Sequence, residues 1–169
     1  MGSAGGPPGL IRAAVQPHLR FTLIESTGKK ARFLRAAADA LGLANVEVLS
    51  ERAEDLARRD DLRAAFDAVL ARAVGRIAVI AELTVPFAKV GGIVLLTKGQ
   101  RADEELEEAR AALHMLHVAV AGVVETPTGR IVAIEKRRVT PHAYPRRAGE
   151  AKRAPLGVSN PAKPARGDD

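Results

Sequence analysis

The chain has 169 residues, of which 47% are hydrophobic and 27% charged, and it contains no cysteine. This length and composition are typical of one globular domain with a core of ordinary size. The lack of cysteine excludes disulfides and thiolate metal sites. No segment approaches the roughly 18 apolar residues of a membrane-spanning helix or has the pattern of a signal peptide. We therefore expect a cytoplasmic protein that does not contact a membrane.

The net charge of +6 is confined to the end of the chain. Residues 1–135 carry 17 basic and 17 acidic side chains, whereas residues 136–169 carry 9 basic and 3 acidic ones. A segment of this kind favours binding to a polyanion, because neutralised phosphates release their counterions. The alternative is a disordered tail that only improves solubility. The shift in charge and proline content predicts a domain over residues 1–138 and a basic, partly disordered tail over 139–169.

In chain order, the sequence predicts alternating strands and helices. Strands are predicted at 21–25, 46–49, 66–71, 93–96, 118–125 and 131–134, and helices at 29–43, at 76–87 and from Asp103 onward. The predicted buried face of the helix at 29–43 holds Phe33, Leu34, Ala37 and Leu41. Such alternation predicts an α/β fold with a mostly parallel sheet, to which the last two strands add an antiparallel hairpin. This combination favours the class I methyltransferase variant of the Rossmann-like fold over a dehydrogenase.

The start of the chain has the pattern of a nucleoside-binding turn. Residues 2–9 read Gly-Ser-Ala-Gly-Gly-Pro-Pro-Gly, which is typical of the turn between a strand and a helix. Glu25 follows after about 20 residues, the spacing expected for an acid that accepts hydrogen bonds from both ribose hydroxyls. Pro7-Pro8-Gly9 fits a dinucleotide loop poorly, because such a loop needs its third glycine at a set distance for helix packing. A plain turn is the alternative. Only Met1 precedes the loop, so we expect the first strand of the sheet to be missing.

Several short stretches repeat the pattern of one known family. They are Gly2 to Leu10, Leu23-Ile24-Glu25-Ser26, Arg52-Ala53-Glu54, Ala71-Arg72-Ala73, Leu96-Thr97-Lys98-Gly99, and Thr140 to Gly149 with Pro155-Leu156-Gly157. On these residues, the chain resembles the GidB/RsmG family over positions 2–158. Its members are bacterial methyltransferases that modify N7 of a guanosine in 16S ribosomal RNA. Ala4 and Pro7 depart from the family loop.

The resemblance implies a function and a set of site residues. It implies a monomeric class I enzyme that takes its methyl group from S-adenosylmethionine and acts on the 16S rRNA of the small ribosomal subunit. The implied cofactor-binding residues are Gly2, Gly5, Pro7, Glu25, Ala53, Glu54 and Arg72. Arg72 and Lys98 are implied as catalytic, and Arg52, Lys98, Arg130, Arg146 and Arg147 as RNA-binding. In the family, a helical region and a first strand precede the glycine loop.

The chemistry of this reaction needs few special side chains. Guanine N7 has a free lone pair, so no general base has to remove a proton, and an in-line transfer needs mainly alignment. We therefore expect no catalytic histidine or cysteine and no metal. Three alternatives stay open: an inactive methyltransferase-like fragment that binds RNA, a class I methyltransferase for another substrate, and another nucleotide-dependent α/β enzyme.

Overall fold

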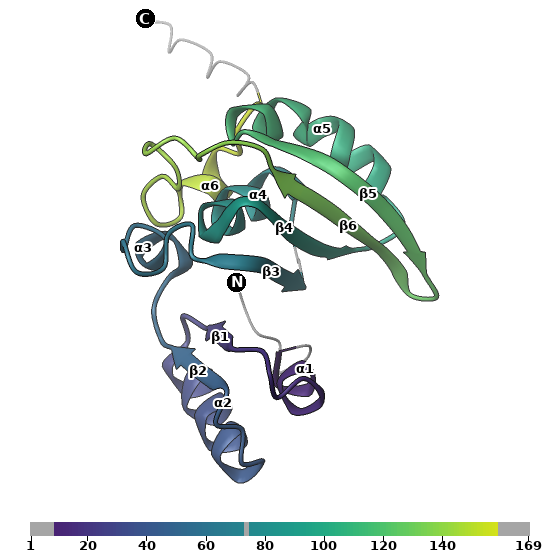
Figure 1. Ribbon diagram of the computed structural model, residues 1–169. Helices are drawn as coiled ribbons and strands as arrows, with labels where there is room; N and C mark the ends of the chain where they lie inside the picture. Colours follow the sequence, from purple (N-terminus) through teal and green to yellow (C-terminus); the bar gives the residue numbers. More distant parts are fainter. Residues whose placement is uncertain (1–8, 73–74, 159–169) are drawn as a thin grey trace, which may run out of the picture.

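The structure is a computed structural model that describes residues 9–72 and 75–158 (Figure 1). The elements, in chain order, are α1 (Gly9–Val15), β1 (Phe21–Ile24), α2 (Gly28–Ala40), β2 (Val46–Leu49), α3 (Ala53–Leu56), β3 (Phe66–Arg72), α4 (Ile77–Thr84), the 3-10 turn η1 (Val85–Phe87), β4 (Ala88–Lys98), α5 (Ala102–Met115), β5 (Val118–Thr126), β6 (Gly129–Lys136) and α6 (Glu150–Arg153). The predicted alternation of strands and helices is confirmed. Among the helices of the described ranges, none is long and apolar enough to cross a bilayer.

The strands form a mostly parallel arrangement that is divided into two sheets. β1 pairs in parallel with β2, and a second sheet has the order β3-β4-β6-β5. Within the second sheet, β3 and β4 are parallel, whereas β6 runs antiparallel to both β4 and β5. The hairpin of β5 and β6 is the predicted antiparallel addition. Within the described residues, no strand pairs β1 or β2 with the second sheet.

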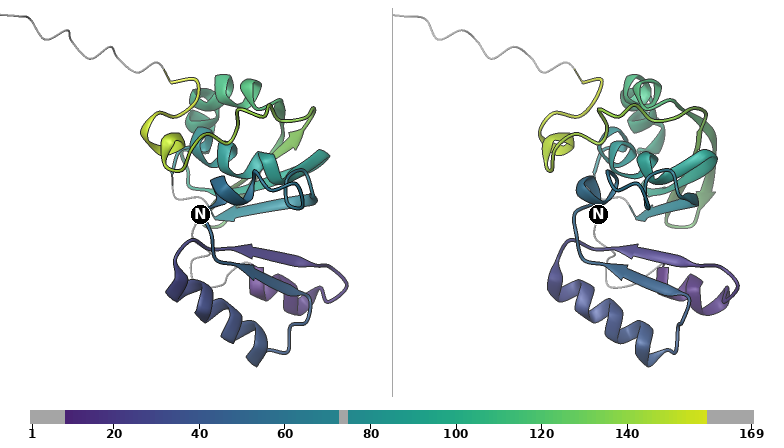
Figure 2. Two further views of the ribbon diagram at one scale, coloured as in Figure 1. Left: turned by 90° about the vertical axis from the view of Figure 1, so that its left-hand side faces the viewer. Right: turned by 60° about the vertical axis from the view of Figure 1, so that its left-hand side comes forward.

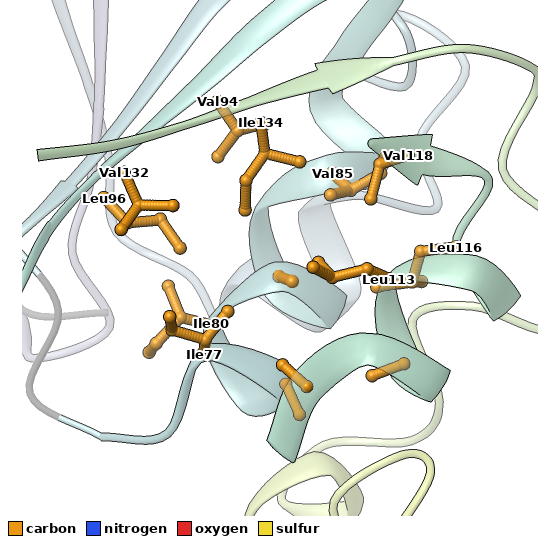
Figure 3. Packing of buried hydrophobic residues seen from close by; sticks show 14 of the residues in the cluster. Ile77, Ile80, Val85, Val94, Leu96, Leu113, Leu116, Val118, Val132 and Ile134 are labelled. Atoms are coloured by element: carbon orange, nitrogen blue, oxygen red, sulfur yellow. The ribbon is translucent and has the colours of Figure 1, made fainter. Parts of the chain in front are cut away.

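The main core lies between the four-stranded sheet and the helices α4 and α5 (Figure 3). Alternate residues of β4 and β6, such as Leu96 and Val132, point toward these helices, because successive side chains of a strand face opposite ways. The other labelled members of this core are Ile77, Ile80, Val85, Val94, Leu113, Leu116, Val118 and Ile134. α4 is apolar on nearly every side, as expected for a helix enclosed by other elements.

The smaller sheet has its own core, built with α1 and α2. Ala31, Leu34 and Ala38 of α2 pack near Leu10 and Val48. The predicted face of this helix was partly wrong: Leu34 is buried, whereas Phe33 and Leu41 are 57% and 61% exposed. The buried face follows the small residues, because alanine allows the helix axis to approach the sheet closely.

The part of the chain after β6 is folded against the domain. Residues 140–156, which we term the C-terminal strap, run beside α3 and α4 and include α6 (Figures 1 and 2). Leu156 of the strap is buried in the main core, and Tyr144 packs against it. Of the predicted tail over 139–169, the structure describes residues 139–158, and residues 159–169 lie outside the described ranges.

Candidate functional site

The candidate site lies at the carboxyl ends of the parallel strands. The arrowheads of β1, β2 and β3 point to one side of the molecule (Figure 2), and β4 is parallel to β3. In open α/β sheets, ligands bind beyond these strand ends, at the point where the strand order reverses. Most of the predicted site residues follow these ends. The loop residues Gly2, Gly5 and Pro7 lie outside the described ranges.

Glu25 directly follows β1 and is almost entirely buried, with 1% of its surface exposed. Its Oε1 accepts a hydrogen bond from the backbone N–H of Thr27 at 2.9 Å. The backbone N–H of Glu25 donates to the carbonyl oxygen of Leu49 at 3.0 Å, which continues the pairing of β1 with β2. These contacts hold the carboxylate in one orientation at the strand end, as required of an acceptor for paired hydroxyl groups.

The short helix α3 follows β2 and carries three of the predicted residues. Arg52 is exposed in front of the helix, whereas Ala53 is 2% and Glu54 is 9% exposed. The Oε1 of Glu54 accepts a hydrogen bond from the backbone N–H of Gly149 at 3.0 Å. The side chain predicted to lie beside a nucleoside is therefore already in contact with the strap.

The two predicted catalytic cations differ in their surroundings. Arg72 is exposed at the end of β3 and has no ion pair within the described residues. Lys98, at the end of β4, is 6% exposed and its Nζ lies 2.7 Å from Oε2 of Glu105. The same ammonium donates to the carbonyl oxygen of Gly75, in the segment that follows β3. Lys98 thus connects β4, α5 and the segment after Arg72.

The predicted RNA-binding cations fall into two groups. Arg52 and Arg147 are exposed. Arg130 forms ion pairs with Asp103 and with Glu125, whose Oε1 lies 3.2 Å from Nη2 of Arg130. Lys98 is paired as described above, and Arg146 is paired with Glu82. Only Arg52 and Arg147 therefore present an unpaired charge to solvent among these five predicted cations.

Glu82 contacts a predicted site residue, Arg146, and was not singled out from the sequence. It lies in α4 with no measurable exposure, and its carboxylate holds Arg146. The Oε1 accepts from the backbone N–H and the Nε of Arg146 at 2.8 and 2.9 Å, and the Oε2 accepts from Nη2 at 2.7 Å. The hydrogen bonds that the Arg146 guanidinium donates to Glu82 raise the pKa of Arg146. A single acid within the apolar run Ile-Ala-Val-Ile-Ala-Glu-Leu-Thr was the signal that could have identified this contact.

Arg63 is a second residue that the sequence did not single out. Its guanidinium donates to four carbonyl oxygens, those of Ala57, Thr140, Pro141 and Tyr144, at 3.0 to 3.2 Å. Three of these acceptors belong to the strap. Within the described ranges, no group of three or more histidine, cysteine, aspartate or glutamate side chains could hold a metal ion.

The arrangement of strands and helices is shared with several solved structures. The antibiotic-resistance methyltransferase Kmr superposes with a TM-score of 0.63 at 13% identity, covering 80% of this chain and 84% of that chain. A mutant of MtNAS in complex with S-adenosylmethionine has a TM-score of 0.57 at 17% identity, covering 81% of this chain and 53% of that one. The fold is that of the class I, Rossmann-like methyltransferases.

Sequence comparison then identifies the family. Residues 1–132 match the GidB family, described as rRNA small subunit methyltransferase G, and the chain belongs to this family. The protein named ribosomal RNA small subunit methyltransferase G from Sorangium cellulosum is 52% identical over 147 residues, which are 87% of this chain and 61% of that protein. The protein of the same name from Rubrobacter xylanophilus is 43% identical over 165 residues, 92% of this chain and 63% of that protein. The chain thus spans about three fifths of the length of these two relatives.

Proposed function

We propose that this protein transfers a methyl group from S-adenosylmethionine to N7 of a guanosine in 16S ribosomal RNA. The observation that carries the proposal is the buried carboxylate of Glu25, held at the carboxyl end of β1 in a chain of the GidB family. In this proposal the protein acts as a monomer in the cytoplasm, on RNA of the small ribosomal subunit. The names of the curated relatives support the choice of substrate.

The described residues at the strand ends fit the cofactor. In the proposal, Glu25 accepts hydrogen bonds from the ribose hydroxyls, and Ala53, at the start of α3, lies beside the adenine. In the proposal, Gly2, Gly5 and Pro7 line the same pocket, and Glu54 lies at its adenine end. When bound, S-adenosylmethionine supplies a methyl group on a positively charged sulfur, which a lone pair can attack directly.

The side chains of this protein would bind and orient rather than move protons. Guanine N7 already presents a lone pair, so alignment supplies most of the rate. The exposed guanidinium of Arg72 can contact the O6 edge of guanine or the cofactor. Lys98 would hold the segment after Arg72 through its bond to Gly75. Arg52 and Arg147 would contact phosphates of the RNA. Arg130 would add a further positive charge, which its ion pair with Asp103 partly neutralises.

Calorimetric titration of the chain with S-adenosylmethionine tests this proposal. Saturable binding is expected, weakened at least about tenfold by Glu25→Ala, because the ribose hydroxyls would lose a charged acceptor. Glu51→Ala is the matched control, since Glu51 is an exposed carboxylate near the end of the neighbouring strand. Equal affinity of the wild type and Glu25→Ala would contradict the assignment of Glu25.

Methyl transfer to undermethylated small subunits tests the reaction itself. The expected product is N7-methylguanosine in 16S rRNA at one position. Transfer to another substrate would favour a different class I methyltransferase, and RNA binding without any cofactor binding would favour an inactive RNA-binding protein.

A further inference from the structure

The C-terminal strap is fastened to the domain by side chains from two places, the segment between α3 and β3 and the helix α4. Arg58 donates to the carbonyl oxygen of Pro145 at 2.6 Å, and Arg63 donates to three carbonyl oxygens of the strap. Glu82 of α4 binds both the backbone and the guanidinium of Arg146. Nη2 of Arg146 also donates to the carbonyl oxygen of Ala154 at 2.7 Å, so that the residue ties the two ends of the strap together.

The middle of the strap contacts the candidate cofactor site. Three residues after Arg146, the backbone N–H of Gly149 donates to Oε1 of Glu54. Gly149 adopts a φ of +81°, a conformation that glycine reaches without strain, and this turn directs its N–H toward α3. Glu54 lies next to Ala53, at the start of the helix that follows the carboxyl end of β2.

The Arg146–Glu82 contact is the fixed point of this arrangement. Glu82 has no exposed surface, so its carboxylate depends on Arg146 for compensation of its charge. The planar guanidinium meets the carboxylate through two parallel hydrogen bonds, a geometry that sets orientation as well as distance. Removal of the guanidinium would leave a buried charge and free the strap three residues before Gly149.

We propose that Arg146 is a positioning residue for the cofactor site: held by Glu82, it fixes the strap so that the N–H of Gly149 orients the carboxylate of Glu54. Arg146 then serves the cofactor rather than the RNA, in contrast to its exposed neighbour Arg147. This inference rests on the proposed function, because it assigns the pocket beside α3 to S-adenosylmethionine.

Cofactor binding and RNA binding, measured separately, test the inference. Arg146→Met is expected to weaken S-adenosylmethionine binding by about tenfold in calorimetry. Its binding to 16S rRNA should keep the salt dependence of the wild type. Arg147→Met is the matched variant, and it should reduce the slope of log affinity against log salt by about one. Arg146→Lys keeps the charge but not the two parallel bonds, and should give an intermediate cofactor affinity.

A destabilised control separates positioning from a general loss of stability. Val132→Ala removes two methyl groups from the main core at β6, a strand that supplies none of the hydrogen bonds to the strap named above, and should leave the cofactor affinity within about twofold of the wild type. The inference is overturned if Arg146→Met binds the cofactor like the wild type, if Val132→Ala weakens binding equally, or if Arg146→Met reduces the salt slope as Arg147→Met does.

Failure of the proposed function has a different signature, namely no cofactor binding by the wild type. Hydrogen exchange then decides the inference about the strap by itself. The amides of Leu56, the last residue of α3, and of Ala57, which caps this helix, donate to the carbonyl oxygens of Arg52 and Ala53. They should exchange faster in Arg146→Met than in Val132→Ala. Equal exchange in the two variants would overturn the inference.

Discussion

Some side chains of this protein carry a charge although they are buried, which costs free energy of folding. Lys136 is the clearest example. It is the last residue of β6, with 1% of its surface exposed. Its Nζ donates to the carbonyl oxygens of Val85 and Ala88 at 3.2 and 2.7 Å, and no carboxylate of the described ranges pairs with it. Burial, followed by repulsion from Arg63, lowers the pKa of Lys136 from its ordinary 10.5 to about 8.

The lowered pKa of Lys136 predicts a rise of stability at alkaline pH. Between pH 8 and 10.5 the folded protein has released the proton, whereas the unfolded chain still binds it, so the free energy of unfolding rises with pH. Relative to Lys136→Met, the wild type should gain on the order of 2 kcal/mol across this window. Urea unfolding of both proteins from pH 7.5 to 10.5 measures the gain. A constant difference over this range would contradict the prediction.

The ion pair of Lys98 and Glu105 predicts a stability defect that a second substitution repairs. Lys98→Met leaves Glu105, whose side chain is 23% exposed, without its cation and should lower the free energy of unfolding by about 2 kcal/mol. The double variant Lys98→Met/Glu105→Leu should recover most of this loss, because it removes the unpaired carboxylate. Thermal unfolding of the two single variants and the double variant gives the coupling energy. Additive effects would show that the pair does not contribute as a unit.

At the scale of elements, periodic patterns predicted helices and strands better than they predicted contacts. The strand at 46–49 has its predicted bounds, whereas the predicted strand at 93–96 extends from residue 88 to 98. The buried face of α2 was misjudged because Phe33 and Leu34 are adjacent on the helix and only one of them faces the sheet. Which one does so depends on how closely the backbone can approach, and this is decided by Ala31 and Ala38.

Gly157 directly follows the strap and lies against α5. We predict that this position tolerates no side chain. Gly157 has a φ of +71°, and a Cβ there would lie 2.6 Å from the Cβ of Ala111 and 3.0 Å from the amide nitrogen of Ala112. Gly157→Ala should therefore lower the free energy of unfolding by about 2–3 kcal/mol. Gly42→Ala is the control, because Gly42 has a similar φ of +65° but open space around it. It should cost only about 1 kcal/mol from backbone strain. Equal losses, measured by urea unfolding, would contradict the packing argument.

At the scale of the whole molecule, the uneven charge distribution determines how the protein meets a polyanion. Arg147, Lys152 and Arg153 are exposed on the strap, and none of them forms an ion pair within the described residues. The cations that the structure pairs internally, such as Arg130 and Arg146, have part of their charge neutralised. The exposed strap residues are therefore the ones expected to release counterions when RNA binds.

Removing the three exposed cations of the strap should change the salt dependence of RNA binding without changing the folding of the protein. The triple variant Arg147→Ala/Lys152→Ala/Arg153→Ala should reduce the slope of log affinity for 16S rRNA against log salt by about two to three. Its free energy of unfolding should stay within about 1 kcal/mol of the wild type, because exposed substitutions cost little. Filter binding at several salt concentrations measures the slope, and an unchanged slope would contradict an RNA-facing strap.

The sequence by itself determined the order of the elements, the mostly parallel pairing with its final hairpin, and the position of Glu25 at a strand end. These features depend on local periodicity and on spacings of about 20 residues, which a linear pattern contains. Only the tertiary structure decided which cations form ion pairs or hydrogen bonds within the protein. Arg146 and Glu82 are 64 residues apart in the chain, and Arg63 and Thr140 are 77 apart. Such contacts arise where elements pack in space, and no periodic pattern specifies a partner at that distance. For the same reason, a tail that is basic in composition became a strap held by buried carboxylates.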